Sequence, residues 1–349
     1  MLGINENTIE QSAIATMQSL GWDYTYGKTI LLGCQNEWRE RTGEVILKPL
    51  LAAAIAKLNP NLPAAEVENV VAMVCRSESG DLAERNRGAY EWLRNGVPYR
   101  YQAQGEQKFE VVRLVDFGVP AHNDFRIVNQ LDIGGKKGKR IPDLIGFVNG
   151  LPLVVFELKN PLKENADIGK AYAQLQTYKE ELAELFVFNQ ALVISDGIVA
   201  RIGSLTADFE RFTPWRVVDE KNKSQRIVFE NELEGLLTGL MTPKNLLDYV
   251  QNFVVFERDN KNRTIKKIGA YHQFYGVNEA VECTLLASSH TGNRKVGVFW
   301  HTQGSGKSLS MLFYAGKVLS QGSLKNPTLV LVTDRNDLDG QLYATFCGG

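Results

Sequence analysis

Two carboxylates and a lysine, Asp143, Glu157 and Lys159, have a spacing that is typical of metal-dependent phosphodiester cleavage. Such hydrolysis needs a divalent metal that activates water and neutralises charge on the phosphate. Mg²⁺ prefers carboxylate oxygens, so we expect Asp143 and Glu157 to be its ligands. Glu157 and Lys159 alternate with apolar residues, which puts both on one face of a strand. Lys159 can then position the attacking water or stabilise charge on the phosphate.

Whether Asp143 reaches the same metal depends on how the two flanking strands are paired. A two-residue turn at Asn149-Gly150 would leave Asp143 opposite Phe156, on the core face. A three-residue loop, or an equivalent bulge, would instead place Asp143 opposite Glu157. The chemistry requires the second register, although the Asn-Gly pair by itself favours the first. A hairpin that merely carries surface charges is the alternative interpretation.

A helix expected at residues 169–185 follows and carries Gln174 and Tyr178 one turn apart on a single face. With the acidic pair and Lys159, these residues resemble the PD-(D/E)xK nucleases, in the branch that adds a Q-x-x-x-Y motif. Glu10, on a helix expected at residues 8–20, matches the acidic residue that such folds aim at the metal. The resemblance makes all three candidate catalytic residues. A solvated helix glutamate is the alternative interpretation of Glu10.

Far downstream, a glycine-rich segment is typical of a loop that binds nucleotide phosphates. It follows an apolar run at residues 296–300, expected to be a strand, and precedes a helix expected at residues 308–320 and a strand at residues 328–332. The residues expected to contact the nucleotide are Gly304, Ser305, Gly306, Lys307 and Ser308.

The chemistry expected of this loop is ATP binding. Its glycines let backbone N–H groups close on phosphate oxygens, Lys307 would contact the β and γ phosphates, and Ser308 would hold Mg²⁺. In the pattern G-x-x-x-x-G-K-[ST] the first glycine would fall at His301, a position that helicase-like motors often relax. Gln273 resembles the adenine-reading glutamine of superfamily 2 helicases, with a plain helix N-terminal residue as the alternative. The segment 333–338 resembles their motif Ia.

Composition bounds the class of protein. Lysine and arginine number 39 and aspartate and glutamate 40, a formal net charge of −1, so no global basic surface marks a nucleic-acid binder. The glycine- and lysine-rich loop from Gly134 to Arg140 fits either local phosphate contact or plain solvation. The four cysteines are scattered without a C-x-x-C pair, which argues against a disulfide framework or zinc site and favours the cytoplasm. No apolar run approaches the ~20 residues that cross a bilayer.

The order of expected elements indicates an α/β protein in three parts. Residues 1–205 are expected to form the nuclease, a mixed sheet flanked by helices, and residues 206–265 a connecting segment with helices. Residues 266–349 are expected to begin a RecA-like, parallel-sheet helicase lobe. Other expected elements are helices at 44–58, 66–74, 232–241 and 243–253 and strands at 109–116, 125–131 and 191–195.

Taken in order, these segments resemble the restriction (R) subunit of type I restriction-modification systems. The resemblance rests on Glu10 to Gly21-Trp22, Asn149 to Leu153 with Glu157-Leu158-Lys159, Gln174-x-x-x-Tyr178, Ser195-Asp196-Gly197, Tyr271-His272-Gln273, Trp300 to Ser308 and Thr333 to Leu338. It implies Mg²⁺-dependent cleavage of unmodified double-stranded DNA, coupled in the intact protein to ATP-driven translocation. It also implies methylation and specificity subunits as partners, and an N-terminal part whose motor is incomplete.

Two other interpretations stay open at this point. A helicase fragment could carry a nuclease-like domain that is only structural, although such a degenerate domain would usually lose one of Asp143, Glu157 and Lys159. A docking module without activity is the non-enzymatic alternative. A cleavage assay on the chain separates that module from a nuclease.

Overall fold

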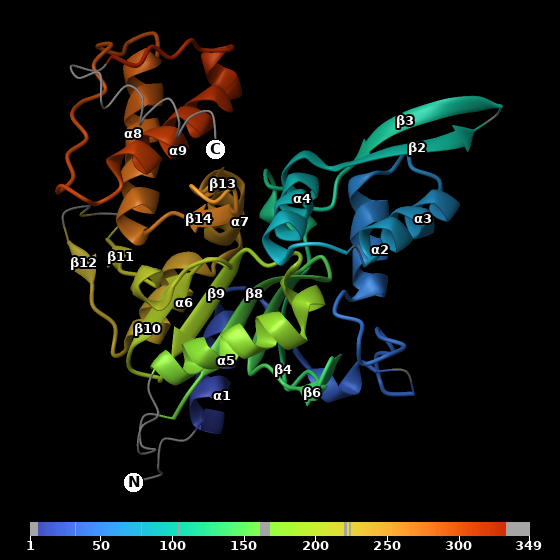
Figure 1. The fold of residues 1–349 in the computed structure, drawn as a ribbon. Helices are drawn as coiled ribbons and strands as arrows, with labels where there is room; N and C mark the ends of the chain where they lie inside the picture. Colours follow the sequence, from blue (N-terminus) through green and yellow to red (C-terminus); the bar gives the residue numbers. More distant parts are fainter. Residues whose placement is uncertain are drawn as a thin grey trace.

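The computed structural model describes residues 6–31, 33–77, 79–103, 105–160, 168–219, 222 and 225–332. These residues form one six-stranded sheet surrounded by helices, with four two-stranded sheets outside it (Figure 1). The segment 333–338, which resembles motif Ia, lies outside the described residues.

The central sheet combines parallel and antiparallel strands. Its order is β1 (Asp23–Tyr26), β4 (Phe125–Asn129), β7 (Leu144–Val148), β8 (Leu151–Leu158), β9 (Ala191–Ser195) and β10 (Ala200–Gly203). β1 runs parallel to β4 and β8 runs parallel to β9, whereas the other neighbours are antiparallel. The predicted mixed sheet flanked by helices is therefore confirmed, and two of the three predicted strands are β4 and β9.

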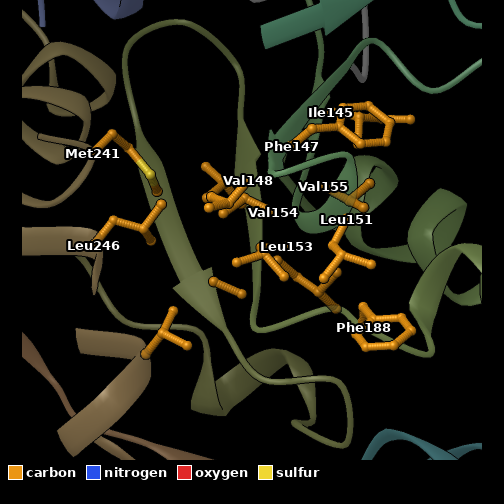
Figure 2. Packing of buried hydrophobic residues seen from close by; sticks show 14 of the residues in the cluster. Ile145, Phe147, Val148, Leu151, Leu153, Val154, Val155, Phe188, Met241 and Leu246 are labelled. Atoms are coloured by element: carbon orange, nitrogen blue, oxygen red, sulfur yellow. The ribbon is translucent and has the colours of Figure 1, made fainter. Parts of the chain in front are cut away.

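Both faces at the centre of this sheet are covered. Every residue of β7, β8 and β9 is buried, which requires packing on both sides. α1 (Glu6–Ser19) contacts β1, β4 and β8, while α5 (Ile168–Glu181) lies across β8 and β9 (Figure 1). Figure 2 shows apolar side chains of the core, among them Phe147 and Val154 of the sheet and Leu246 from a later helix.

A helical layer and a projecting hairpin precede β4. The helices are α2 (Lys48–Leu58), α3 (Ala64–Val74) and α4 (Leu82–Asn95), and the hairpin is formed by β2 (Val97–Ala103) and β3 (Glu106–Val112) (Figure 1). The helix predicted from residue 44 begins only at Lys48, because Pro49 fixes its first turn. The strand predicted at 109–116 ends earlier, since the N–H of Arg113 leaves the ladder to donate to Asn59 Oδ1 (2.8 Å).

Short elements complete the described chain. The segment from Gly134 to Arg140, predicted as a loop, is instead a hairpin. The short strands are β5 (Ile133–Gly135), β6 (Gly138–Arg140), β11 (Val217–Val218), β12 (Arg226–Ile227), β13 (Val254–Arg258) and β14 (Thr264–Ile268), and the 3-10 turns are Gly27–Thr29, Pro120–His122, Ala183–Phe186, Phe209–Arg211 and Gly322–Leu324. None of the helices in the described ranges is both long and apolar enough to cross a membrane.

The segment after the sheet packs back onto it. It contains α6 (Glu232–Leu240), α7 (Pro243–Asn252) and the β13–β14 hairpin. The indole N–H of Trp22, which follows α1, donates to the carbonyl of Met241 at 2.6 Å. α6 also contacts α1 and β10. The connection is therefore a packed layer and not a free linker.

Lys266, on β14, is the most deeply placed charged group of this layer. Its side chain is buried, and burial lowers its pKa well below the ordinary value. The amine donates to Asn86 Oδ1 (2.9 Å), the carbonyl of Asn189 (2.6 Å) and Gln190 Oε1 (2.9 Å). Lys266 thus connects β14 to α4 and to the loop that precedes β9.

Beyond this layer, α8 (Tyr271–Ser288) and α9 (Lys307–Leu319) pack together, but the strands predicted around α9 do not form. Residues 296–300 and 328–332 are unpaired, and Val298 and Val332 are 93% and 89% exposed. A parallel strand needs neighbouring strands for its backbone groups, and no described strand supplies them. The two predicted strands are therefore absent from the described residues, and a RecA-like parallel sheet stays a prediction.

The turn that joins β7 to β8 has two left-handed residues. Asn149 has φ 52° and Gly150 has φ 77°, as in a type I′ turn. Asn149 is buried, donates to the carbonyl of Leu114 (2.9 Å) and accepts from the N–H of Asp124 (2.8 Å). The carbonyl of Gly150 accepts from the N–H of Leu47 (2.9 Å), and a Cβ on Gly150 would collide with the Leu47 carbonyl.

We predict that Gly150→Ala destabilises the fold by about 2–4 kcal/mol, because it adds a steric collision to backbone strain. Gly33→Ala is the matched control, since Gly33 has a φ of 83° and nothing lies within 4 Å of its Cβ position. The control should lose only about 1 kcal/mol, the strain of a left-handed residue. Urea unfolding of both variants measures the difference, and equal losses would contradict the packing argument.

Candidate active site

The pairing of β7 with β8 contains one extra residue. The register shifts between Gly146 and Phe147, so Leu153 is a bulge in β8 without a partner on β7. The carbonyl of Leu153 accepts instead from the N–H of Gln190 (2.6 Å) and from the side-chain amide of Asn189 (3.2 Å). Asn189 and Gln190, which come just before the neighbouring strand β9, therefore hold the bulge in place.

This bulge decides which way Asp143 faces. Beyond it, Leu144 pairs with Phe156, so Asp143 comes opposite Glu157. The turn is the tight one that Asn-Gly favours, and the bulge restores the register that the chemistry requires. The second of the two predicted registers is therefore confirmed, by the bulge and not by a longer loop.

The three predicted catalytic groups lie together, with few other partners. Asp143 Oδ2 accepts from the N–H of Leu158 at 2.6 Å. Glu157 is fully buried, its Oε1 is paired with the ammonium of Lys159, and its Oε2 has no hydrogen-bond partner among the described residues. Lys159 also donates to the carbonyl of Leu158 at 3.1 Å.

Burial sets the protonation of this pair. It raises the pKa of Glu157 to about 8, a rise to which the charge of Asp143 adds and which Lys159 opposes. It also raises the pKa of Asp143 to about 6, against the N–H of Leu158 and the charge of Lys159. The ion pair with Lys159 favours a charged Glu157, but the loss of hydration outweighs it. Without a cation, burial therefore favours the protonated form of this pair.

The same features fit a divalent cation. A buried carboxylate oxygen without a partner, on Glu157, beside a second carboxylate, on Asp143, is a donor set that suits Mg²⁺. In the described part of the chain, no three His, Cys, Asp or Glu side chains gather closely enough to hold an ion. Asp143 and Glu157 would therefore share the ion with water molecules, which Mg²⁺ usually retains.

Glu10 lies near the pair and is fixed in place. Its charge contributes to the raised pKa of Asp143. It is 5% exposed, and its carboxylate accepts from the side-chain amides of Asn129 and Gln130, the latter at 3.0 Å. The alternative of a solvated glutamate is therefore wrong. The sequence reasoning missed Asn129 and Gln130, whose signal was two adjacent amides at the end of an apolar strand.

Gln174 and Tyr178 hold the backbone that leads into Asp143. The amide of Gln174 donates to the hydroxyl oxygen of Tyr178 at 2.5 Å, and that hydroxyl donates to the carbonyl of Ile141 at 3.3 Å. Tyr178 is buried, and burial raises its pKa. Gln174 and Tyr178 therefore act on the site through the backbone carbonyl of Ile141, which lies just before Asp143.

The glycine-rich loop has the backbone of a phosphate-binding turn. Gly304 and Gly306 have φ of 82° and 80°, and α9 begins at Lys307. The first N–H groups of α9 are therefore available to an anion. Gln273 is buried, its amide donates to the carbonyl of Gly306 (3.1 Å) and its oxygen accepts from the N–H of Ala270 (2.9 Å). It contacts the loop here, and its role in adenine recognition stays a prediction.

Other residues of the loop lie around the start of α9. The carbonyl of Ser305 is 3.2 Å from Nε2 of His272. Ser308 lies in the first turn of the helix. His301, at the position of the missing glycine, packs against Phe299 with ring centroids 4.4 Å apart. An imidazole thus occupies the place where the usual pattern has no side chain.

Comparison with known proteins finds matches for the segment that carries the acidic pair and for the segment that carries the glycine-rich loop. The family described as type I restriction enzyme R protein N terminus matches residues 3–211, and the family described as SWI2/SNF2 ATPase matches residues 272–348. The chain is 60% identical over 347 residues to the type I restriction enzyme HindI endonuclease subunit of Haemophilus influenzae, which covers 99% of the chain and 33% of that relative.

A second relative, from Methanocaldococcus jannaschii, is provisionally named as a type I restriction enzyme endonuclease subunit. It is 34% identical over 364 residues, which cover 98% of the chain and 34% of that relative. The chain thus spans about a third of the length of these relatives.

We predict that Glu157→Gln stabilises the metal-free chain by an amount that grows with pH. The pKa of Glu157 in the folded chain is about 8, above the ordinary value, so folding favours the protonated form. The stability that this proton supplies is complete below the ordinary pKa of a glutamate and is lost as pH rises through about 8. An amide does not suffer this loss. Urea unfolding in EDTA, from about pH 5 to about pH 8, measures the difference.

Glu106→Gln, at an exposed position, is the control and should show no such trend. Mg²⁺ added at high pH should stabilise the parent chain more than Glu157→Gln, since a ligand that binds the folded state raises its stability. A difference between Glu157→Gln and the parent that shrinks as pH rises would refute the assignment.

Proposed function

Because the chain belongs to the family of type I restriction enzyme R proteins, we propose that it carries the endonuclease of such an enzyme, a Mg²⁺-dependent site that cleaves unmodified double-stranded DNA. The observation that carries this proposal is the bulge at Leu153, which sets Asp143 opposite Glu157. The proposed nuclease is a PD-(D/E)xK domain over residues 1–205. A connecting segment over residues 206–265 and a helicase-like lobe from residue 266 follow it.

Each polar group of the site has a part in this reaction. When bound, Mg²⁺ supplies an activated water and a positive charge beside the phosphate. Asp143 and Glu157 would hold the ion, the latter through its buried Oε2. Lys159, paired with Oε1 of Glu157, is placed to orient the water or to stabilise charge on the phosphate.

Three further residues serve the site from the two helices. Glu10, on α1, would add negative charge near Asp143 while its amide partners hold it in place. Gln174 and Tyr178 fix the carbonyl of Ile141 and therefore the direction in which the chain enters β7. Precise placement matters because small displacements of reacting groups lower rates steeply.

Asp143→Ala and Glu157→Ala should each abolish Mg²⁺-dependent DNA cleavage in a complex reconstituted with the partner subunits, a loss of at least about 10²-fold. ATP hydrolysis by the same complex should survive, because these carboxylates lie outside the glycine-rich loop. Glu106→Ala, an exposed carboxylate, is the control and should cleave normally. Cleavage of a supercoiled plasmid and phosphate release are the two measurements. Loss of ATP hydrolysis with intact cleavage would reverse the assignment.

The glycine-rich loop supports a second activity, ATP-driven DNA translocation in the intact protein. The match to the SWI2/SNF2 ATPase family over residues 272–348 supports this proposal. Lys307 would contact the β and γ phosphates and Ser308 would hold Mg²⁺. For Gln273 to recognise adenine, its amide would have to leave the carbonyl of Gly306. Methylation and specificity subunits, in the cytoplasm, are the proposed partners.

Lys307→Ala should weaken ATP binding at least about tenfold, because it removes the cation expected at the β and γ phosphates. Lys295→Ala, an exposed lysine before the loop, is the matched control. Calorimetric titration with ATP and Mg²⁺ measures both variants. Equal affinity of the parent and Lys307→Ala would show that the loop does not bind phosphate as proposed.

A further inference from the structure

The β5–β6 hairpin presents a row of lysines next to the candidate active site. Lys136, Lys137 and Lys139 are all exposed, and only Ile141 and Pro142 separate the end of the hairpin from Asp143. Surface lysines on a mobile loop would mean little. Such lysines can seat a ligand at the site only where the hairpin is held in a fixed relation to the carboxylates.

Backbone contacts fix the hairpin on two sides. The N–H of Gly134 donates to the carbonyl of Thr42 at 3.0 Å, and the N–H of Lys136 donates to the carbonyl of Glu181 at 3.2 Å. A Cβ on Gly135 would collide with the side chain of Leu182 and with the Glu181 carbonyl. The hairpin therefore packs closely against the C-terminal end of α5 (Figure 1).

One face of α5 connects the hairpin to the active site. Tyr178 and Glu181 are three residues apart and share this face. Tyr178 donates to the carbonyl of Ile141, while the buried carboxylate of Glu181 pairs with Arg140 at 2.6 Å. Arg140 and Ile141, just before Asp143, are thus held by two residues that lie one turn apart on α5.

The hairpin keeps an excess of positive charge. Arg140 is matched by Glu181, while Lys137 lies 3.9 Å from the same Glu181 and Lys139 lies 3.2 Å from Asp132. No acidic group of the described chain lies within ion-pair distance of Lys136. Since the formal net charge of the chain is −1, attraction for a polyanion must be local.

We propose that Lys136, Lys137 and Lys139 form a rigid ridge that binds backbone phosphates of double-stranded DNA beside the cleavage site. The inference rests on the proposed nuclease function and adds the surface that seats its substrate. Lysines on a fixed hairpin neutralise phosphates without reading bases. Such contacts set the position of the duplex and carry no sequence information.

The test compares Lys136→Gln/Lys137→Gln/Lys139→Gln with a control of equal charge change, Lys57→Gln/Lys108→Gln/Lys244→Gln, whose lysines are exposed elsewhere. Binding of a fluorescent duplex to the chain is measured by anisotropy in EDTA, over a range of salt concentrations. Each phosphate contact adds about 0.9 to the slope of log affinity against log salt, so the ridge variant should lose about 2–3 from that slope. The control should keep the slope of the parent.

A ridge variant with the slope of the parent, or a control that loses as much, would overturn the inference. The proposed nuclease function has a separate test, which compares plasmid cleavage by the parent and by Asp143→Ala in the presence of Mg²⁺. Equal cleavage by the two would contradict that function without touching the ridge. Because binding is measured in EDTA, a chain that does not cleave still reports on the ridge.

Discussion

The pairing of β7 with β8 is the constraint on which the site depends. Side chains alternate across a strand, so a shift of one residue turns every following side chain to the other face. The tight turn alone would leave Asp143 on the core face. The extra residue at Leu153 shifts the register, so that Asp143 comes opposite Glu157. Its freed carbonyl is satisfied by Gln190 and Asn189, so the fold leaves no buried acceptor unpaired at this point.

Burial raises the pKa of both carboxylates that this register brings together. Asp143 and Glu157 are withdrawn from water, repel each other, and have Lys159 as their nearby cation. Such a group of buried charges is tolerated when the surrounding structure holds it firmly. Here the apolar strands β7 to β9 supply the stability. The amides around Glu10 and the hydroxyl of Tyr178 supply the orientation.

The sequence predicts the parts of this molecule whose signal is local. Spacing predicted that Asp143, Glu157 and Lys159 come together, and periodicity predicted the helix that carries Tyr178. The bulge at Leu153 could be required by the chemistry but not located, because its partners come from the loop before β9. The strand predicted at residues 296–300 is absent for a similar reason, because an apolar run forms a strand only where neighbouring strands can pair with it.

Helix α4 was missed because its sequence is mostly polar, yet it buries Asn86 against the loop before β9. There Asn86 meets Lys266, which also contacts Asn189 and Gln190, the residues that hold the bulge. The geometry of the acidic pair is therefore supported by a residue encoded far downstream of it. A genetic crossover between the two would separate a donor from its acceptors. A chimeric chain that took these two segments from different parents would therefore have to keep the contacts of Lys266 to keep the shape of the site.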